Sequence, residues 1–484
     1  MKTIYLKAIV KVIGLVLMFE ALFMILGVLF SIYYRDNDIP AIVISSLITL
    51  ITGAVLYFGT RKINYNKLGK REGYIIVSLS WFVLGAFGAL PFVISGYIPS
   101  YTDAFFETVS GFTTTGSSIL NNIESLPHGL LFWRSMTHWL GGLGVIVLVI
   151  AVLPFFGFGG MQLYVAEVTG PSKDKLHPRV TTTARRIWGV YILLSIFLAF
   201  LYLAGDMNLF EALCHTFGTM ATGGFSPKNT SLANYSPYIQ WVTTIFMVFA
   251  GTNFTLFYFM LKGKGKTVFR NEELKYYLSI FIFATVILTL VLYTGGYYNF
   301  HDAARHSAFQ AIGIISTTGY ASADFMVWPV FTYTLLFFLM FVGGMAGSTG
   351  GSIKIIRHVV LIKAVKNVIK RIMHPNAVLP VTYNGNPVSQ SAVMNVVSVF
   401  ILFLITLFIG SALLALAGEG VVESISGTAS AVCNIGPGLN SIGPTGNYSG
   451  LADFSKWVLS VMMIMGRLEL ITVLILINPS FWRK

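Results

Sequence analysis

The feature that most constrains this chain is a short glycine-containing segment that recurs four times between long apolar runs. The first copy reads FETVSGFTTTG at 106–116, and its relatives end in ATGG at 221–224, STTG at 316–319 and CNIG at 433–436. Each copy is too short to cross a bilayer, which takes about 20 apolar residues as a helix. The pattern therefore predicts four short re-entrant helices, each followed by an extended turn.

Extended backbone at membrane depth restricts where these turns can lie. It leaves carbonyl oxygens without partners in their own segment, so it survives only when buried in protein or lining a watery cavity. Four such turns around one axis would form a ring of oxygens that replaces the hydration shell of a cation. We therefore expect the four turns to line one pore, with their glycines at equivalent positions: Gly116, Gly224, Gly319 and Gly436.

The spacing of acidic residues supports this equivalence. Asp103, Glu211 and Glu423 each lie 13 residues before the glycine of their copy, while Asp302 lies 17 residues before Gly319, one helical turn more. An acid at a helix start complements the positive end of the helix dipole, and the negative end then points toward the filter. This orientation favours cations over anions.

Composition places the chain among polytopic membrane proteins. Of its 484 residues, 55% are hydrophobic and 11% are charged. The net charge of +13 does not indicate nucleic-acid binding, because the basic residues lie in short loops between apolar spans. Twenty-six of the 32 Lys and Arg residues fall on one predicted side and five on the other, which predicts that both termini are cytoplasmic. Two cysteines imply no disulfide framework.

The order of spans predicts an all-α polytopic membrane protein. Two spans at about 8–33 and 40–60 form an N-terminal transmembrane hairpin, which together with its inner loop occupies residues 1–71. Four pseudo-repeats of helix, re-entrant pore helix, filter loop and helix then surround a central pore. Their expected limits are 72–183, 184–272, 273–388 and 389–484.

Two further features lie within predicted spans. Five glycines between Gly343 and Gly351 disfavour a continuous helix, since each costs about 1 kcal/mol relative to Ala. We expect the second span of repeat 3 to break there into a loop at membrane depth, the alternative being a close-packed glycine seam between helices. Arg467 lies far from either end of the last span, where a charge usually faces a cavity or a partner.

Several segments resemble one known family nearly end to end. They are DAFFE at 103–107, TTTG at 113–116, WLGGLG at 139–144, GSTGG at 347–351, NIGPG at 434–438 and GRLE at 466–469. Together with the N-terminal hairpin, these motifs resemble the TrkH/TrkG branch of the Trk/Ktr/HKT potassium transporter superfamily. The copies differ among themselves, with two glycines in the second and Asn-Ile-Gly-Pro in the fourth, so fourfold symmetry is only approximate.

The resemblance implies K+ uptake, with some Na+ permeability, across the inner membrane of a bacterium. It implies a homodimer regulated by a cytosolic, nucleotide-binding TrkA-type ring, so that any nucleotide acts through this partner and the chain itself carries no cofactor. The implied K+ filter comprises Thr114, Thr115, Gly116, Thr222, Gly223, Gly224, Thr317, Thr318, Gly319, Asn434, Ile435 and Gly436. The implied gate comprises Gly343, Gly344, Met345, Ala346, Gly347, Ser348, Thr349, Gly350 and Gly351, with Arg467 just below the filter as a barrier to cations.

Two other classes of protein remain open at this point. A secondary symporter coupling K+ to Na+ or H+ would also use broken helices near the membrane midplane. A membrane enzyme has less support, because no nucleophile lies beside a base and His138, His215, His306 and His358 are dispersed. An ion pair or loop carbonyls remain an alternative role for Arg467.

Overall fold

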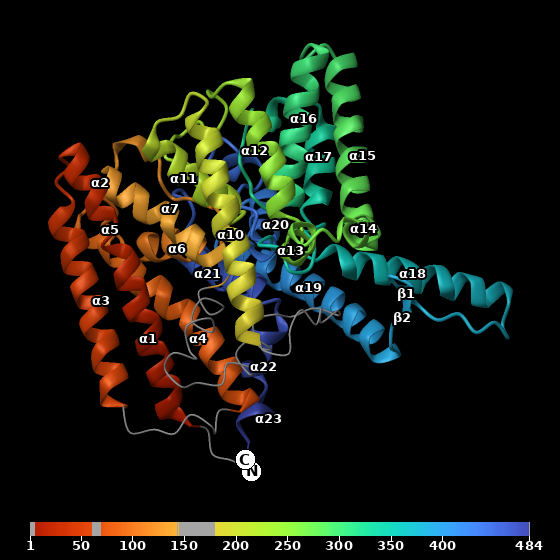
Figure 1. Ribbon diagram of the computed structural model, residues 1–484, viewed down its shortest axis with the longest axis horizontal. Coiled ribbons are helices and arrows are strands. Elements are labelled where there is room, and N and C mark those ends of the chain that lie inside the picture. Colours follow the sequence, from red (N-terminus) through yellow and green to blue (C-terminus); the bar gives the residue numbers. More distant parts are fainter. Residues whose placement is uncertain (1–4, 61–68, 143, 145–179, 484) are drawn as a thin grey trace.

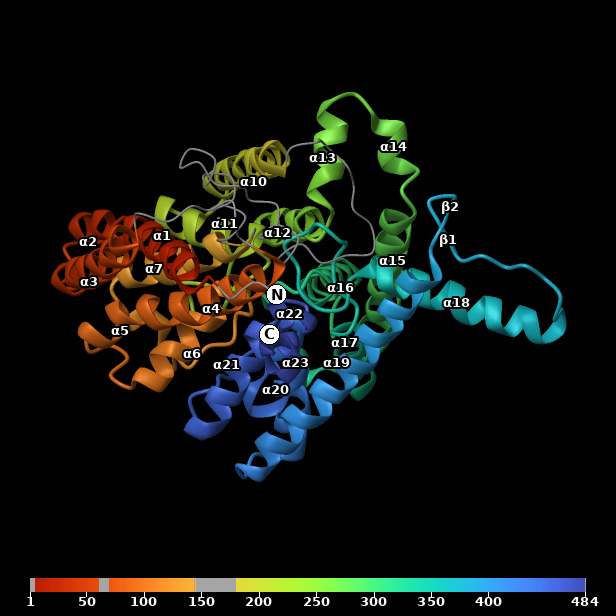
Figure 2. The same cartoon turned by 90° about the horizontal axis from the view of Figure 1, so that it is seen from below.

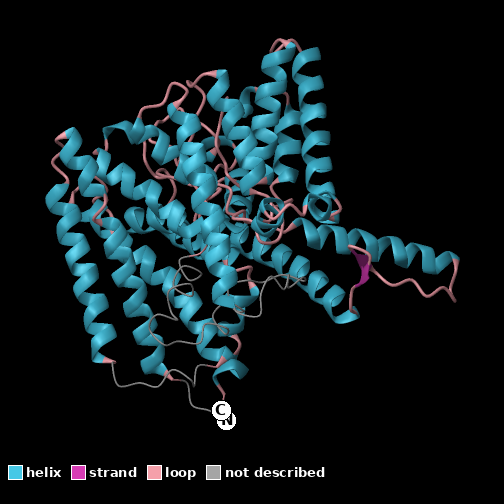
Figure 3. Cartoon of the chain, viewed as in Figure 1, coloured by secondary structure: helices cyan, strands magenta, loops and turns pink. Residues whose placement is uncertain are grey.

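The computed structural model describes residues 5–60, 69–142, 144 and 180–483 (Figure 1). These residues are predominantly helical, and one small two-stranded sheet is present among them (Figure 3). Residues 143 and 145–179 are outside the described part of the chain. They include the second half of the predicted last span of repeat 1 and most of the predicted inner loop after it.

The N-terminal hairpin consists of α1 (Leu6–Met24), α2 (Gly27–Tyr34) and α3 (Ile39–Gly59). Helices α1 and α3 pack closely where Gly14 of one faces Gly53 of the other. A side chain on either glycine would collide with the carbonyl oxygen of the other. Small residues allow this kind of close approach between membrane helices. The predicted hairpin is confirmed, and it stands at one side of the molecule (Figure 1).

Four helical repeats follow the hairpin. Repeat 1 contains α4 (Lys70–Gly88), α5 (Leu90–Ile94), α6 (Tyr101–Phe112) and α7 (His128–Gly142). Repeat 2 contains α10 (Val180–Leu203), α11 (Leu209–Met220), α12 (Pro237–Ala250), α13 (Phe254–Leu261) and α14 (Gly265–Phe269). Repeat 3 contains α15 (Glu272–Thr294), α16 (Phe300–Ile315), α17 (Val330–Leu339), α18 (Ile355–Met373), β1 (Thr382–Tyr383) and β2 (Asn386–Pro387). Repeat 4 contains α19 (Gln390–Leu416), α20 (Val421–Cys433), α21 (Asp453–Arg467), α22 (Ile471–Ile477) and α23 (Pro479–Trp482).

The repeats close into a circle. Figure 2 shows them in chain order around a common centre. Helix α7 packs against α11, α12 against α16, α18 against α19, and α21 against α6, so repeat 4 returns to repeat 1. Three short 3-10 turns, Ile123–Ser125, Phe325–Val327 and Asn440–Ile442, occupy the same place after the filters of repeats 1, 3 and 4.

Six helical segments of the described residues are long and apolar enough to cross a membrane, and up to eight when two bent helix pairs are counted as spans. The bent pairs are α12 with α13, at 96°, and α21 with α22, at 117°. Both had been predicted as continuous spans. The chain is therefore a multi-pass membrane protein in which some second helices of the repeats are broken.

Repeat 3 departs most from a simple pair of spans. No helix covers the residues between α17 and α18, which include the glycine cluster at 343–351. Helix α18 then projects away from the body, accompanied by the β1–β2 hairpin (Figures 1 and 2). The hairpin turns through Asn384 and Gly385, which both have positive φ, the conformation that an Asn-Gly turn favours.

Candidate selectivity filter and gate

The four re-entrant helices α6, α11, α16 and α20 begin in the same way. Each carries an acidic residue in its first turn, at the third helical position. In the first three, the side chain of the preceding cap residue accepts a hydrogen bond from the backbone N–H of that acid, while the residue before α20 is Gly420, which provides no side-chain cap. The extra turn predicted for repeat 3 is present, because α16 has 16 residues where α6 and α11 have 12. The caps are Ser100, Asn208 and Asn299, and the acids are Asp103, Glu211, Asp302 and Glu423.

Each helix ends in the same backbone turn. The filter glycine has positive φ in every copy, between +74° and +109°, and so does the residue two positions before it. Positive φ is rare for Thr, so three equivalent threonines in this region mark a conformation imposed by the surroundings. The residues in the left-handed region are Thr114 and Gly116, Thr222 and Gly224, Thr317 and Gly319, and Asn434 and Gly436.

The four turns meet edge to edge. A methyl group added to the filter glycine of one repeat would collide with the carbonyl oxygen of the residue before the glycine in the next repeat. The order of contacts is cyclic and closes on itself, so the four glycines surround one axis. The contacts join Gly116 to Gly223, Gly224 to Thr318, Gly319 to Ile435 and Gly436 to Thr115.

These carbonyl oxygens are available to a ligand. Among the residues that the structure describes, no hydrogen bond is made to the carbonyl oxygens of Thr115, Thr318 or Ile435, while the backbone of Gly223 bonds the imidazole of His138. A buried carbonyl without a partner is costly, so such groups are ordinarily satisfied by protein, water or a bound group. A ring of four carbonyls beside the negative ends of four helices fits a weakly hydrated monovalent cation.

The fourth repeat breaks the symmetry. The carbonyl oxygen of Gly436 accepts hydrogen bonds from the hydroxyls of Ser117 (2.9 Å), Ser430 (2.9 Å) and Tyr448 (2.8 Å). This oxygen is therefore engaged, whereas no such bond is made to the carbonyl oxygens of Gly116, Gly224 and Gly319 within the described part of the chain. The predicted asymmetry of the copies thus has a structural counterpart in repeat 4.

Filter side chains brace the turns from behind. The hydroxyls of Thr113 and Thr115 lie 2.8 Å apart, and those of Ser316 and Thr318 lie 2.7 Å apart. The Asn434 amide donates to Thr115 Oγ1 (2.9 Å), which links repeat 4 to repeat 1. These hydroxyls hold the backbone in place and leave its carbonyls free.

A buried ion pair missed by sequence reasoning lies behind the filter. Arg134 on α7 donates to Glu107 Oε1 on α6 (2.6 Å) and to the carbonyl oxygen of Ser226, beyond the filter of repeat 2 (3.0 Å). Glu107 also accepts from Ser118 Oγ and the Ile119 backbone N–H. Arg134 had been counted only as an outer-loop charge, because its partner is distant in sequence.

The loop between α17 and α18 lies directly against the filter turns. The Gly351 backbone N–H donates to Thr317 Oγ1 (2.7 Å), and Thr349 Oγ1 donates to the carbonyl oxygens of Met220 and Ala250 (3.1 Å each). A side chain on Gly350 would meet the carbonyl oxygen of Ser316. We call residues 343–352, which include the candidate gate residues, the gate loop; they lie next to the helix ends of repeats 2 and 3.

The gate loop is also anchored by Glu273 and Lys354. Oε1 of Glu273, on α15, accepts hydrogen bonds from the backbone N–H groups of Ala346 (2.8 Å) and Ile356 (3.1 Å). Lys354 is buried and donates to the carbonyl oxygen of Gly350, so it holds the last part of the loop. Asn253 caps α13 by accepting a hydrogen bond from the Thr255 N–H (2.8 Å).

Arg467 joins the gate loop to repeat 1. Its guanidinium donates to the carbonyl oxygens of Thr349 (2.6 Å), Gly141 (2.6 Å) and Gly142 (2.5 Å). This corresponds to the loop-carbonyl arrangement left open by the sequence. The expectation that Arg467 lies inside a continuous helix was wrong, since it is the last residue of α21.

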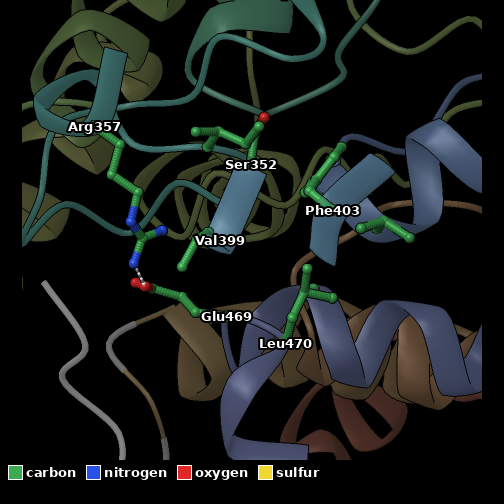
Figure 4. A pocket seen from close by; sticks show the side chains of 9 residues that line it. Ser352, Arg357, Val399, Phe403, Glu469 and Leu470 are labelled. Carbon is green, nitrogen blue, oxygen red and sulfur yellow. Dashed lines mark hydrogen bonds and ion pairs between the residues drawn. The ribbon is translucent and has the colours of Figure 1, made fainter. Parts of the chain in front are cut away.

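The break after Arg467 follows from the backbone. Glu469 and Leu470 both have positive φ, so α22 sets off in a new direction. Glu469 pairs with Arg357 of α18 beside a small pocket that Ser352 and Phe403 also line (Figure 4). Among the described residues there is no cluster of three His, Cys, Asp or Glu side chains that could hold a metal ion.

A multi-pass helical protein with four re-entrant turns around one axis belongs to the class of membrane cation transport proteins. The family described as TrkH, cation transport protein, matches residues 38–484. The chain therefore belongs to the TrkH family, whose members are transporters and not enzymes.

Similar proteins cover the whole chain. It is 38% identical to the Trk system potassium uptake protein TrkH of Salmonella typhimurium, over 99% of each chain. It is 34% identical to the Trk system potassium uptake protein TrkG of Escherichia coli, over the full length of both. The crystal structure of the potassium transporter TrkH from Vibrio parahaemolyticus has a TM-score of 0.89 and 33% identity, covering 99% of this chain and 100% of that one.

Proposed function

We propose that the chain takes up K+ across the inner membrane of a bacterium through a channel-like pore. The observation that carries this proposal is the closed ring of filter turns, in which each glycine faces a carbonyl oxygen of the next repeat. The names of the relatives, which describe potassium uptake, support K+ as the ion. The engaged Gly436 carbonyl makes the ring unequal, so some Na+ also passes.

The pore-forming units are the repeats at 72–183, 184–272, 273–388 and 389–484. The filter consists of residues 114–116, 222–224, 317–319 and 434–436. The gate loop and Arg467 form the barrier below it, because the loop contacts the filter turns and Arg467 places a positive charge against the loop. A fixed positive charge raises the energy of a cation nearby.

The proposed assembly is a homodimer with both termini in the cytoplasm. A TrkA-type nucleotide-binding ring docks on its inner face and regulates the pore. Among the described residues, the basic segments 262–275 and 363–371 are mostly exposed and could receive it. A third basic segment, 173–186, lies partly outside the described residues.

Reconstitution of the purified chain in liposomes tests the proposal. With an outward K+ gradient and no Na+ or H+ gradient, K+ flux is expected, and it increases when the cytosolic ring and nucleotide are added. The two bent helix pairs favour a symporter as the second candidate, because broken helices bind ions in such transporters. K+ movement that requires a Na+ or H+ gradient would favour coupling and contradict the channel.

A further inference from the structure

One filter position differs from the other three without a backbone reason. The residue before the filter glycine is Thr115, Thr318 or Ile435 in three repeats, but Gly223 in repeat 2. Gly224 has positive φ and Gly223 does not. Gly223 could therefore carry a side chain if only its own backbone were considered.

The space beside Gly223 is occupied by an imidazole. A Cβ built on Gly223 would collide with ring atoms of His138, which is fully buried on α7. The ring comes from repeat 1, yet it takes the place of the side chain that repeat 2 lacks. The imidazole of His138 can lie here only because residue 223 has no side chain.

The imidazole is bonded at both nitrogens. Nε2 accepts a hydrogen bond from the backbone N–H of Phe225 (3.1 Å), the residue after the filter glycine. Nδ1 lies 2.6 Å from the carbonyl oxygen of Gly111 in pore helix α6. Since a carbonyl only accepts, the proton is on Nδ1 and the ring is neutral. His138 therefore ties the pore helix of repeat 1 to the filter of repeat 2.

Phe225 is held on both sides by the same helix. The imidazole of His138 stacks on its ring with centroids 4.1 Å apart, and the guanidinium of Arg134 lies 3.5 Å from its centroid. Arg134 and His138 are four residues apart and share one face of α7. Phe225 is thereby fixed by its N–H bond to His138 and two ring contacts, and its carbonyl oxygen also accepts a hydrogen bond from the Tyr320 hydroxyl (3.2 Å).

We propose that His138 is a specificity-determining positioning residue, which sets where the repeat 2 carbonyls stand in the filter and so sets the preference for K+ over Na+. The inference rests on the proposed function, because it assumes that these carbonyls contact the ion. His138 does not touch the ion itself. It acts through Gly223 and Phe225.

The test is reciprocal rescue, read as the K+/Na+ permeability ratio of the full chain in liposomes under bi-ionic conditions. His138→Ala removes the brace and is expected to lower the ratio by about threefold or more, the size of effect of one lost neutral hydrogen bond. Gly223→Thr alone collides with the ring and also lowers the ratio. In the double variant, the introduced threonine takes the vacated space as Thr115 and Thr318 do, and the ratio returns to within about twofold of the unsubstituted chain.

A wild-type ratio in His138→Ala, or a double variant no better than the product of the two single effects, overturns the inference. If His138→Ala does not fold, His138→Gln and Gly223→Ala replace it. Gln can donate and accept at the same two sites and is expected to keep the ratio, whereas Gly223→Ala lowers it; the opposite pattern contradicts the proposal. His306→Phe is the matched control, because His306 is also buried but bonds Ser322 Oγ and does not contact Gly223 or Phe225.

Failure of the proposed function would look different. An unsubstituted chain that shows no K+ flux without a coupled gradient, or whose selectivity survives Gly319→Ala, argues against the filter itself. An unsubstituted chain with a K+-selective flux that responds to Gly319→Ala but is indifferent to His138 argues only against this inference.

Discussion

At Gly116, glycine is required for two reasons that can be separated by experiment. Its φ is +84°, and a methyl group there would collide with the Gly223 carbonyl. Gly96 has a similar φ of +78° but nothing within 4 Å of an added methyl. Gly96→Ala is therefore expected to cost about 1 kcal/mol of stability and leave flux unchanged. Gly116→Ala is expected to lose K+ selectivity as well, as measured by bi-ionic flux. If Gly96→Ala and Gly116→Ala have the same K+ selectivity, the contact between Gly116 and the Gly223 carbonyl does not matter for selectivity.

Arg467 combines a charge with three hydrogen bonds to backbone carbonyls. Arg467→Ala removes both, so single-channel conductance is expected to rise. Arg467→Lys retains the charge but offers no planar fork to reach carbonyls of the gate loop and α7 together. Conductance of the Lys variant close to wild type would assign the barrier to charge, and conductance close to the Ala variant would assign it to the bonds. An Ala variant that conducts no better would contradict the barrier.

Functional residues could be predicted from the sequence where they recur in each repeat. Residues whose role depends on a contact with a distant part of the chain could not. The four glycines could be found because three of them lie 13 residues after an acid and the fourth lies one helical turn further from its acid. The left-handed Thr114, Thr222 and Thr317 could not, since Thr rarely adopts positive φ. His138 gave no signal either. The one related sequence feature is the second glycine at 223, where the other repeats have a side chain.

Among the elements, the gate loop depends on one carboxylate of α15. Glu273 Oε1 accepts from the N–H groups of Ala346, within the loop, and of Ile356, in the α18 turn that follows the loop. Glu273→Ala leaves both groups unpaired, at a cost of about 1–3 kcal/mol each. If the loop in this structure is the closed form, basal K+ flux in liposomes without the cytosolic ring is expected to rise about tenfold or more.

Glu272 is the matched control for this prediction. It lies next to Glu273 on α15 but pairs with Lys363 and bonds the Asn384 N–H, so it holds α18 and the hairpin and not the loop. Glu272→Ala is expected to leave basal flux near the wild-type level. A rise of equal size in both variants would mean that general loosening of α15, and not the loop anchor, causes the effect.

Helices and loops could be predicted from the sequence where several residues indicate the same structure. Five glycines in nine residues predicted the interruption before α18, and an acid at the helix start marked every pore helix. The bends at Gly251 and Leu470 were missed, because a single glycine is tolerated within a helix and Leu at positive φ has no sequence signature. Tertiary contacts decide both. The Gly251 carbonyl accepts from Met345 of the gate loop, and Arg467 is drawn to carbonyls of two repeats.

In the whole molecule, the four repeats form a closed ring both at the filter turns and in the segments that follow them. The filter turns meet in cyclic order, and the segments beyond them are linked in the same order. Backbone bonds join Leu232 and Ala321 between repeats 2 and 3, and Tyr448 and Ser118 between repeats 4 and 1. Side chains join Asn229 and Glu124 between repeats 1 and 2, and Thr445 and Asp324 between repeats 3 and 4. These links join all four repeats in the same cyclic order as the filter turns. The β1–β2 hairpin was missed, although its Asn-Gly turn is a strong local signal.

Orientation in the membrane is the prediction that charge alone makes for the whole chain. The split of 26 to five Lys and Arg residues places α3's last residue, Gly59, inside the cell and Gly450, beyond the fourth filter, outside. Cysteines suit both positions, because a side chain there meets open space, and the native Cys214 and Cys433 are buried.

With a membrane-impermeant maleimide on intact cells, Gly450→Cys is expected to be labelled and Gly59→Cys is not. Both react once the membrane is permeabilised, which controls for reactivity, and the unsubstituted chain reports background from its two cysteines. Labelling of Gly59→Cys in intact cells would reverse the orientation. The acidic starts of the four pore helices would then face the cytoplasm, and the gate loop would face the outside, where a cytosolic regulator cannot reach it.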